Sequence, residues 1–124
     1  MILGPMHRMT LDEGPIRSEF HDDPQLTGIL AAFLDEIPDR IRELQDHFDH
    51  GRMDSLRRLA HQLKGAGGGY GFQVITDQAD ALLRLLDQGE EEWANRSRIA
   101  FQRMVGTLRR AHDSRPDLPA QDHV

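Results

Sequence analysis

Apolar residues recur at intervals of three and four along most of this chain, and this spacing constrains the fold more than any other feature. One such series runs from Leu26 to Phe48, and others follow within residues 56–63, 75–86 and 93–111. An α-helix advances about 100° per residue, so residues three and four apart lie on one face. Each series therefore predicts an amphipathic helix with one face to bury.

Length and composition favour a single helical domain. A chain of 124 residues is long enough for one hydrophobic core and too short for two ordinary domains. Aromatic residues make up only 6% of the chain and hydrophobic residues 38%, which suits a helical protein better than a β-sandwich. We therefore predict an all-α fold, an antiparallel up-down four-helix bundle with an extra short N-terminal helix.

Prolines and a glycine set the expected limits of the first helices. Asp23 followed by Pro24 is a favourable helix start, because the Asp side chain accepts free N–H groups and proline fits the first helical position. Pro38 interrupts the first apolar face, so it either kinks one helix or starts a second, and we expect a short first helix followed by a second. The second should run from Pro38 to about His50 and be closed by Gly51.

The next two helices have clear expected boundaries. The first of them should open at Met53 or Asp54 and continue to the glycine cluster at 65–71, which ends or loosens it. The apolar pattern resumes over 72–88, and Gly89 supplies a stop.

The last helix and the two chain ends complete the expected organisation. Glutamates at 90–92 suit the first turn of a helix, which should extend to about Asp113. Glycines and prolines interrupt both ends of the chain. We expect a flexible leader over 1–22, the bundle over 23–113 and a disordered tail over 114–124.

Charge and residue usage exclude several classes of protein. A net charge of -6 argues against a general nucleic-acid binder, which would carry a basic surface. The absence of cysteine excludes disulfides, thiol catalysis and zinc-thiolate sites. The sequence has no apolar run of membrane-spanning length and no signal peptide pattern. We expect a cytoplasmic monomer with no nucleic acid or membrane among its partners.

One histidine, His61, faces away from the apolar stripe of its own helix. The centre of that stripe lies roughly 150° from His61 around the helix axis, so the imidazole should point to solvent. Residues within about 60° of it share its face. They are Arg57, Lys64, Gly65 and Gly68.

This group of residues suits phosphoryl transfer. A neutral imidazole is a nucleophile near neutral pH, and it can take a phosphoryl group and pass it to a carboxylate. Lys64, the only lysine of the chain, can neutralise the phosphoryl oxygens, and Arg57 can assist. Glycine leaves the backbone bare, so another protein can approach the histidine at Gly65 and Gly68.

Each part of the group also has a simpler explanation. A surface histidine is usually solvated and idle, and a glycine cluster after a helix is usually a cap and a loop. We keep the idle interpretation for the other six histidines, which are His7, His21, His47, His50, His112 and His123.

The segment LAHQLKGAGGGYGF at 59–72 resembles the signature of histidine-containing phosphotransfer (HPt) domains. That signature is A-H-x-L-K-G followed by small residues and by a glycine about ten positions after the histidine. The matching positions are Ala60, His61, Leu63, Lys64, Gly65 and Gly71. The ending Gly69 to Phe72 is also similar to the phosphoacceptor domain of chemotaxis kinases. The resemblance covers most of the chain, from about 24 to 113.

The resemblance implies a phosphocarrier that is not itself an enzyme. His61 would receive a phosphoryl group from a receiver aspartate or a kinase and pass it to another receiver aspartate. The implied partners are a response-regulator receiver domain, a hybrid histidine kinase, or both. HPt proteins bind no ATP and need no cofactor of their own, because the magnesium sits in the receiver. Many place an orienting Gln or Glu 22 positions after the histidine, where this chain has Leu83, and Asp80 is the candidate substitute.

Four alternatives accompany this hypothesis. A di-metal bundle site is disfavoured because no histidine has a Glu three residues before it, and His47 with His50 is a weak metal signal. The glycines match neither G-x-G-x-x-G nor the P-loop pattern of nucleotide sites. A non-catalytic bundle that docks a signalling partner without phosphorylation stays open. So does a piece of a larger hybrid kinase.

Overall fold

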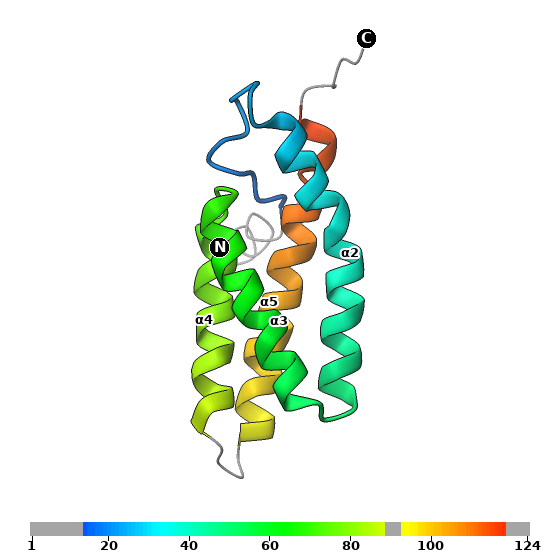
Figure 1. The fold of residues 1–124 in the computed structure, drawn as a ribbon, viewed down its shortest axis with the longest axis vertical. Coiled ribbons are helices and arrows are strands. Elements are labelled where there is room, and N and C mark those ends of the chain that lie inside the picture. Colours follow the sequence, from blue (N-terminus) through cyan, green and yellow to red (C-terminus); the bar gives the residue numbers. More distant parts are fainter. Residues whose placement is uncertain (1–13, 89–92, 119–124) are drawn as a thin grey trace, which may run out of the picture.

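The computed structural model describes residues 14–88 and 93–118, and it forms an antiparallel bundle of four helices (Figure 1). The helices are α2 (Thr27–Asp49), α3 (Met53–Gly69), α4 (Gln73–Gln88) and α5 (Trp93–His112), and a short 3₁₀ helix, η1 (Arg115–Asp117), follows α5. The described ranges contain no β-strand. The all-α bundle predicted from the apolar spacing is confirmed.

The four helices pack around a square, each against two neighbours. α3 contacts α2 and α4, and α5 contacts the same two helices from the other side. α3 and α5 therefore lie diagonally across the bundle, with α3 at the front of the view in Figure 1 and α5 behind it. As a result, the outward faces of α3 and α5 point in opposite directions.

The predicted apolar stripes meet in one continuous core. Side chains that are almost completely buried come from all four helices and from the α3–α4 connection, and they include Leu30, Ile37, Leu44, Leu56, Phe72, Ile75, Leu82, Met104 and Leu108. Burial of such a side chain stabilises the fold by about 1.5–3 kcal/mol. Stacked aromatic pairs join the helices at both ends of the bundle, Phe33 on Tyr70 at 4.4 Å and Phe48 on Phe101 at 4.3 Å between ring centroids. None of the described helices is long and apolar enough to cross a bilayer.

The expectation that one helix ends and a second begins at Pro38 was wrong. α2 runs without a break from Thr27 to Asp49 and contains Pro38. Residues 14–26 form turns and irregular chain, so the extra short N-terminal helix is not found in the described part of the leader. Proline in a helix interior costs about 3 kcal/mol. Here Ile37 and Ile41 are buried on either side of Pro38, and keeping the apolar stripe in register offsets that cost.

The predicted helix limits are otherwise close to those observed. α2 begins at Thr27, a few residues after the expected start, and Asp23 lies in the preceding turn, where its carboxylate accepts a hydrogen bond from the N–H of Gln25 at 2.9 Å. α3 opens at Met53 as expected, and it continues through the glycine cluster as far as Gly69. Gly51 closes α2 with a positive φ of 68°. The expected stop at residue 89 and acidic turn at 90–92 lie outside the described residues.

The leader expected to be flexible over 1–22 is packed on the bundle wherever it is described, at 14–22. The N–H of Ile16 donates to the carbonyl of Arg110 at 3.0 Å, and the N–H of Glu19 donates to the carbonyl of Gly71 at 2.9 Å. Ser18 is buried, and its hydroxyl donates to the carbonyl of Tyr70 at 2.6 Å. These backbone hydrogen bonds hold the segment against α5 and the α3–α4 turn, which the sequence pattern does not reveal.

The tail expected to be disordered over 114–124 is also ordered where it is described, at 114–118. Leu118 is buried beside the core. Arg115 pairs with Asp35 at 2.9 Å, and Arg17 pairs with Asp117 at 3.0 Å. Pro116, one of the two prolines that suggested disorder, lies within this short 3₁₀ helix, and Pro119 lies outside the described residues.

The α3–α4 turn offers a test of the packed leader. Gly71 has a φ of 82°, and an added Cβ would lie 2.3 Å from the Ser18 hydroxyl. We predict that Gly71→Ala lowers the free energy of unfolding by about 2–4 kcal/mol, from backbone strain and the clash together. The matched variant Gly51→Ala has a φ of 68° and open space around it, so it should lose only about 1–2 kcal/mol. Denaturant titration measures both values, and equal losses would show that the leader does not press on Gly71.

Candidate functional site

His61 stands on the outward face of α3, in the position that the helical spacing predicts. The residue is exposed, and its neighbours Leu59, Ala60 and Leu63 are buried in the core. Its ring makes no hydrogen bond or ion pair with the described part of the chain. Both ring nitrogens are therefore open to solvent or to another molecule.

The surface around His61 does not form a closed reaction site. Two hollows of about 260 and 190 Å³ lie along the seam between α2 and α3, and both are lined by Arg40, Leu59 and Gln62. His61 lines neither of them. An exposed nucleophile without a cavity needs a second molecule to supply the rest of the site.

Lys64, one turn after His61, belongs to a charged network that joins α3 to α4. Its Nζ lies 2.9 Å from Oδ1 of Asp80, and Nε of Arg84 lies 2.9 Å from Oδ2 of the same carboxylate. The hydrogen bond from Lys64 holds the pKa of Asp80 below its usual value, partial burial opposes this, and the charge of Arg84 assists. Asp80 is thus ionised at neutral pH and keeps the Lys64 ammonium on this surface.

The role expected for Asp80 differs from the contacts that it makes. Both carboxylate oxygens face cations, and Asp80 forms no hydrogen bond with His61. Leu83 is buried in the core, with 6% of its surface exposed. The described residues therefore provide no side chain that orients the imidazole, and Asp80 instead positions Lys64.

Arg57, also expected near the histidine, is held toward the end of α4. Its guanidinium contacts Asp87 at 3.0 Å and Asp54 at 3.1 Å, and it donates to the carbonyl of Leu86 at 3.3 Å. These contacts occupy its donors on the side away from Lys64. The structure thus brings Lys64 and Asp80 together and leaves Arg57 apart from them.

Thr76 joins the two helices at the level of the site, and the sequence analysis missed it. Its hydroxyl donates to the carbonyl of Lys64 at 2.6 Å and accepts from the N–H of Gly68 at 2.8 Å. Asp80 lies one turn further along α4. Two consecutive turns of α4 therefore hold the backbone and the side chain of Lys64. The sequence did contain a signal for this contact, because Thr76 places a hydroxyl on α4 soon after the glycine cluster of α3.

The glycines of α3 fall into two kinds. A Cβ on Gly67 would lie 2.6 Å from the Thr76 hydroxyl and 2.7 Å from the Thr76 nitrogen, so close packing against α4 requires glycine there. Gly65 is exposed with open space around it, and Gly68 is exposed with its nearest neighbours at 3.7 Å. The two glycines expected to lie at a docking surface are therefore not needed for packing.

Metal chemistry has no evident place among the described side chains. Those side chains form no group of three or more His, Asp and Glu residues that could hold a metal ion. The histidine pair His47 and His50 lies at the end of α2, where His50 contacts Asp46 at 3.1 Å. The chemistry of this surface is that of an imidazole, an ammonium and an open backbone.

Comparison with known proteins connects this surface with one family. The model of a family described as Hpt domain matches residues 28–111, which includes all of α3 and α4. No curated protein and no solved structure is significantly similar to the chain.

The two kinds of glycine give a matched pair of variants. Gly67→Ala should lower the free energy of unfolding by about 1–3 kcal/mol, because the new methyl group meets Thr76 and forces α3 away from α4. Gly65→Ala should raise it by about 0.5–1 kcal/mol, because alanine favours a helix and meets nothing. Thermal or denaturant unfolding provides the comparison. The close-packing assignment fails if Gly67→Ala is as stable as Gly65→Ala.

Proposed function

This chain belongs to the Hpt domain family, whose members serve phosphotransfer in two-component systems, and we propose that His61 is its phosphoacceptor. The observation that carries the proposal is the exposed imidazole of His61, with the Lys64 ammonium one turn away on the same helix. The open positions Gly65 and Gly68 complete a surface that another protein can approach.

The proposed reaction moves a phosphoryl group between a receiver aspartate and His61. The unprotonated ring nitrogen supplies the electron pair for a new N–P bond. The P–O bond of the aspartyl phosphate breaks, and the aspartate leaves as a carboxylate. The reverse step returns the group to the same or another receiver. The receiver supplies the magnesium, so this chain needs no cofactor and no ATP-binding domain of its own.

Lys64 provides charge compensation in this proposal. A phosphoryl group on His61 adds nearly two negative charges beside the Lys64 ammonium. The ammonium is held on Asp80 at 2.9 Å, and a change of side-chain rotamer carries it to the phosphoryl oxygens. Asp80 is a positioning residue, because it keeps Lys64 near the site when His61 carries no phosphoryl group. Arg57 keeps its contacts with α4 and has at most an assisting role.

The partners follow from the need for a second molecule at His61. A response-regulator receiver domain, a hybrid histidine kinase, or both would dock over Gly65 and Gly68 and enclose the imidazole. We propose that the chain acts in the cytoplasm as a monomeric phosphocarrier. A receiver that closes over this surface would also exclude water from the phosphorylated histidine.

One observation favours a second candidate function. The imidazole has no hydrogen-bond partner among the described residues to orient it for attack. A bundle that docks a signalling partner without being phosphorylated would need no such partner. The two candidates differ in whether His61 ever carries phosphate.

Phosphate labelling separates them. Incubation with a phosphorylated receiver domain should label the chain with acid-labile, base-stable phosphate. His61→Gln should remove the label completely and change the free energy of unfolding by no more than about 0.5 kcal/mol, because the side chain is exposed. Retention of the full label in this variant would show that His61 is not the acceptor.

Substitution of Lys64 tests the charge compensation. Lys64→Ala should slow phosphoryl transfer by about 10- to 100-fold, because a hydrogen bond to a charged group is worth about 1.5–3 kcal/mol. Rapid-quench measurement of the transfer rate with one purified receiver gives this value. Arg42→Ala removes an exposed cation from α2 and serves as the matched control, with an unchanged rate expected. If both variants react as fast as the native chain, Lys64 has no part in the transfer.

A further inference from the structure

α5 has a charge composition opposite to that of the whole chain. Arginines occupy five positions of this helix, 96, 98, 103, 109 and 110, and the helix contains no Asp or Glu. The complete chain has a net charge of -6. Positive charge is thus concentrated on one helix of an acidic protein, which makes that helix a candidate surface for an acidic partner.

Three of these arginines have no carboxylate partner among the residues that the structure describes. Arg96, Arg103 and Arg109 are exposed and make no ion pair with the described residues. The other two are engaged, Arg98 over the ring of Phe48 at 5.4 Å and Arg110 as a donor to the carbonyl of Gly14 at 2.8 Å. Elsewhere in the described bundle, most arginines pair with an Asp or Glu. The lack of such partners on α5 leaves three cations available to another molecule.

An exposed apolar side chain and a bare glycine lie between these arginines. Ile99 has 55% of its surface exposed, which is unusual for a large hydrophobic residue of this bundle. Gly106, two turns later, has open space where a Cβ would stand, so packing does not explain a glycine in mid-helix. The spacing of these residues places them on one side of the helix. We call this the α5 face, and its residues are Arg96, Ile99, Gln102, Arg103, Gly106 and Arg109.

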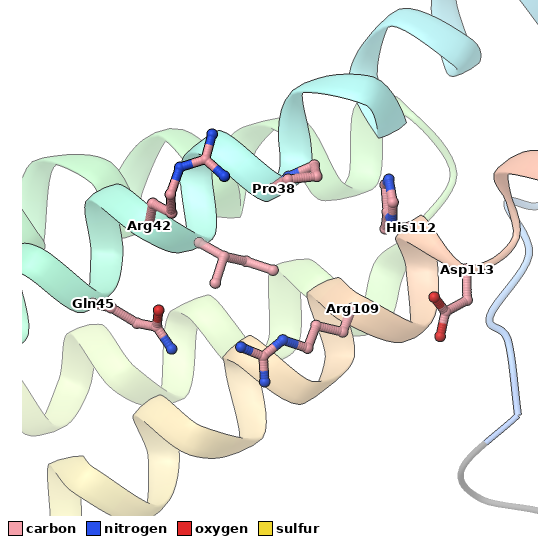
Figure 2. A pocket seen from close by; sticks show the side chains of 7 residues that line it. Pro38, Arg42, Gln45, Arg109, His112 and Asp113 are labelled. Atoms are coloured by element: carbon pink, nitrogen blue, oxygen red, sulfur yellow. The ribbon is translucent and has the colours of Figure 1, made fainter.

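A hollow of about 360 Å³ between α2 and α5 borders the α5 face (Figure 2). Figure 2 shows the Arg109 side chain reaching along the hollow toward Gln45, with His112 and Asp113 at the other end. Arg42 also lines it, but its guanidinium is paired with Asp39. Arg109 is therefore the cation that can meet a carboxylate at this edge.

We propose that the α5 face docks a carboxylate-rich helix of another protein. Arginine binds carboxylates through two parallel hydrogen bonds, so Arg96, Arg103 and Arg109 suit Asp and Glu side chains. Ile99 and the bare backbone at Gly106 receive an apolar side chain between them. The stretch from Arg96 to Arg109 extends about 20 Å at 1.5 Å per residue, which matches several turns of a helix.

Other polyanions fit this surface less well. A helix that binds a membrane surface exposes a broad apolar face, but the apolar residues of α5 from Ala100 onward lie in the core, and Ile99 is the one large apolar side chain that is exposed among those described on this helix. A nucleic acid extends beyond one helix and would meet the exposed acids of α2, which include Asp35, Glu36, Asp39 and Glu43. These acids would repel it. A short acidic helix meets the three arginines along the α5 face, and Asp113 lies only at its edge, beside the hollow.

The position of the α5 face sets it apart from the surface around His61. α3 and α5 lie diagonally across the bundle, so their outward faces can be occupied together. The proposal does not depend on phosphorylation of His61. The α5 face is a second docking surface, and a partner bound there leaves His61 accessible.

A designed acidic peptide tests the proposal directly. The probe is a synthetic helical peptide with Glu residues at i and i+4 along one face and Leu between them, added at low salt to the complete chain labelled for NMR. The signals that shift should belong to the α5 face. Arg103→Glu should weaken binding at least tenfold, and Arg58→Glu, an exposed arginine of α3 with the same charge change, should weaken it less than threefold. Equal losses in the two variants, shifts spread over other helices, or no binding would overturn the proposal.

A second variant tests the face without changing its charge. Gly106→Leu should not lower stability, because the position is open and leucine favours a helix, but it should weaken peptide binding at least fivefold. Undiminished binding would contradict docking over Gly106. Duplex DNA and phosphatidylserine vesicles serve as the other probes. If the native chain binds DNA or the vesicles more tightly than it binds the peptide, and Arg103→Glu loses this binding, the α5 face recognises that polyanion. This result would overturn the choice of a protein partner.

Discussion

The close approach of α3 and α4 at Gly67 determines how the candidate site is built. Because Gly67 has no side chain, the hydroxyl of Thr76 can reach both the carbonyl of Lys64 and the N–H of Gly68. That contact fixes the register of the two helices and brings Asp80 within 2.9 Å of the Lys64 ammonium. The buried stripe of α3 then directs His61 outward. The arrangement of the candidate site follows from one tightly packed helix pair.

The parts of the fold that apolar spacing controls could be predicted from the sequence. Burial of an amphipathic face supplies most of the stability of a helix in a protein, so the all-α class, the four helices and the outward direction of His61 were predictable. α2 shows the limit of this reasoning. Pro38 is a strong local signal for a break, yet the stripe continues through Ile37 and Ile41, and tertiary packing keeps the helix whole.

The features that depend on individual hydrogen bonds and ion pairs could not be predicted. Residues 16–19 pack through two backbone hydrogen bonds and one hydrogen bond from the Ser18 hydroxyl, and no periodic side-chain pattern reveals these contacts. The ordered chain after α5 depends on the pairing of Arg115 with Asp35, across a large separation in sequence. In the same way, Asp80 was expected to orient the imidazole of His61, and only the register of α3 and α4 decides that it holds Lys64 instead.

If His61 is the phosphoacceptor, as we propose, the lack of a partner for its ring among the described residues has a consequence for the selectivity between receivers. A hydrogen bond to one ring nitrogen normally fixes the tautomer, and with it the nitrogen that attacks. The described residues of this bundle form no hydrogen bond with either ring nitrogen. A docked protein would therefore have to fix the tautomer and the orientation of the ring. The rotational entropy of the imidazole is then lost only when the partner docks. A protein that docks without orienting the ring therefore accelerates phosphoryl transfer very little. Cognate and non-cognate receivers would therefore differ more in the rate of phosphoryl transfer within the complex than in the lifetime of the complex.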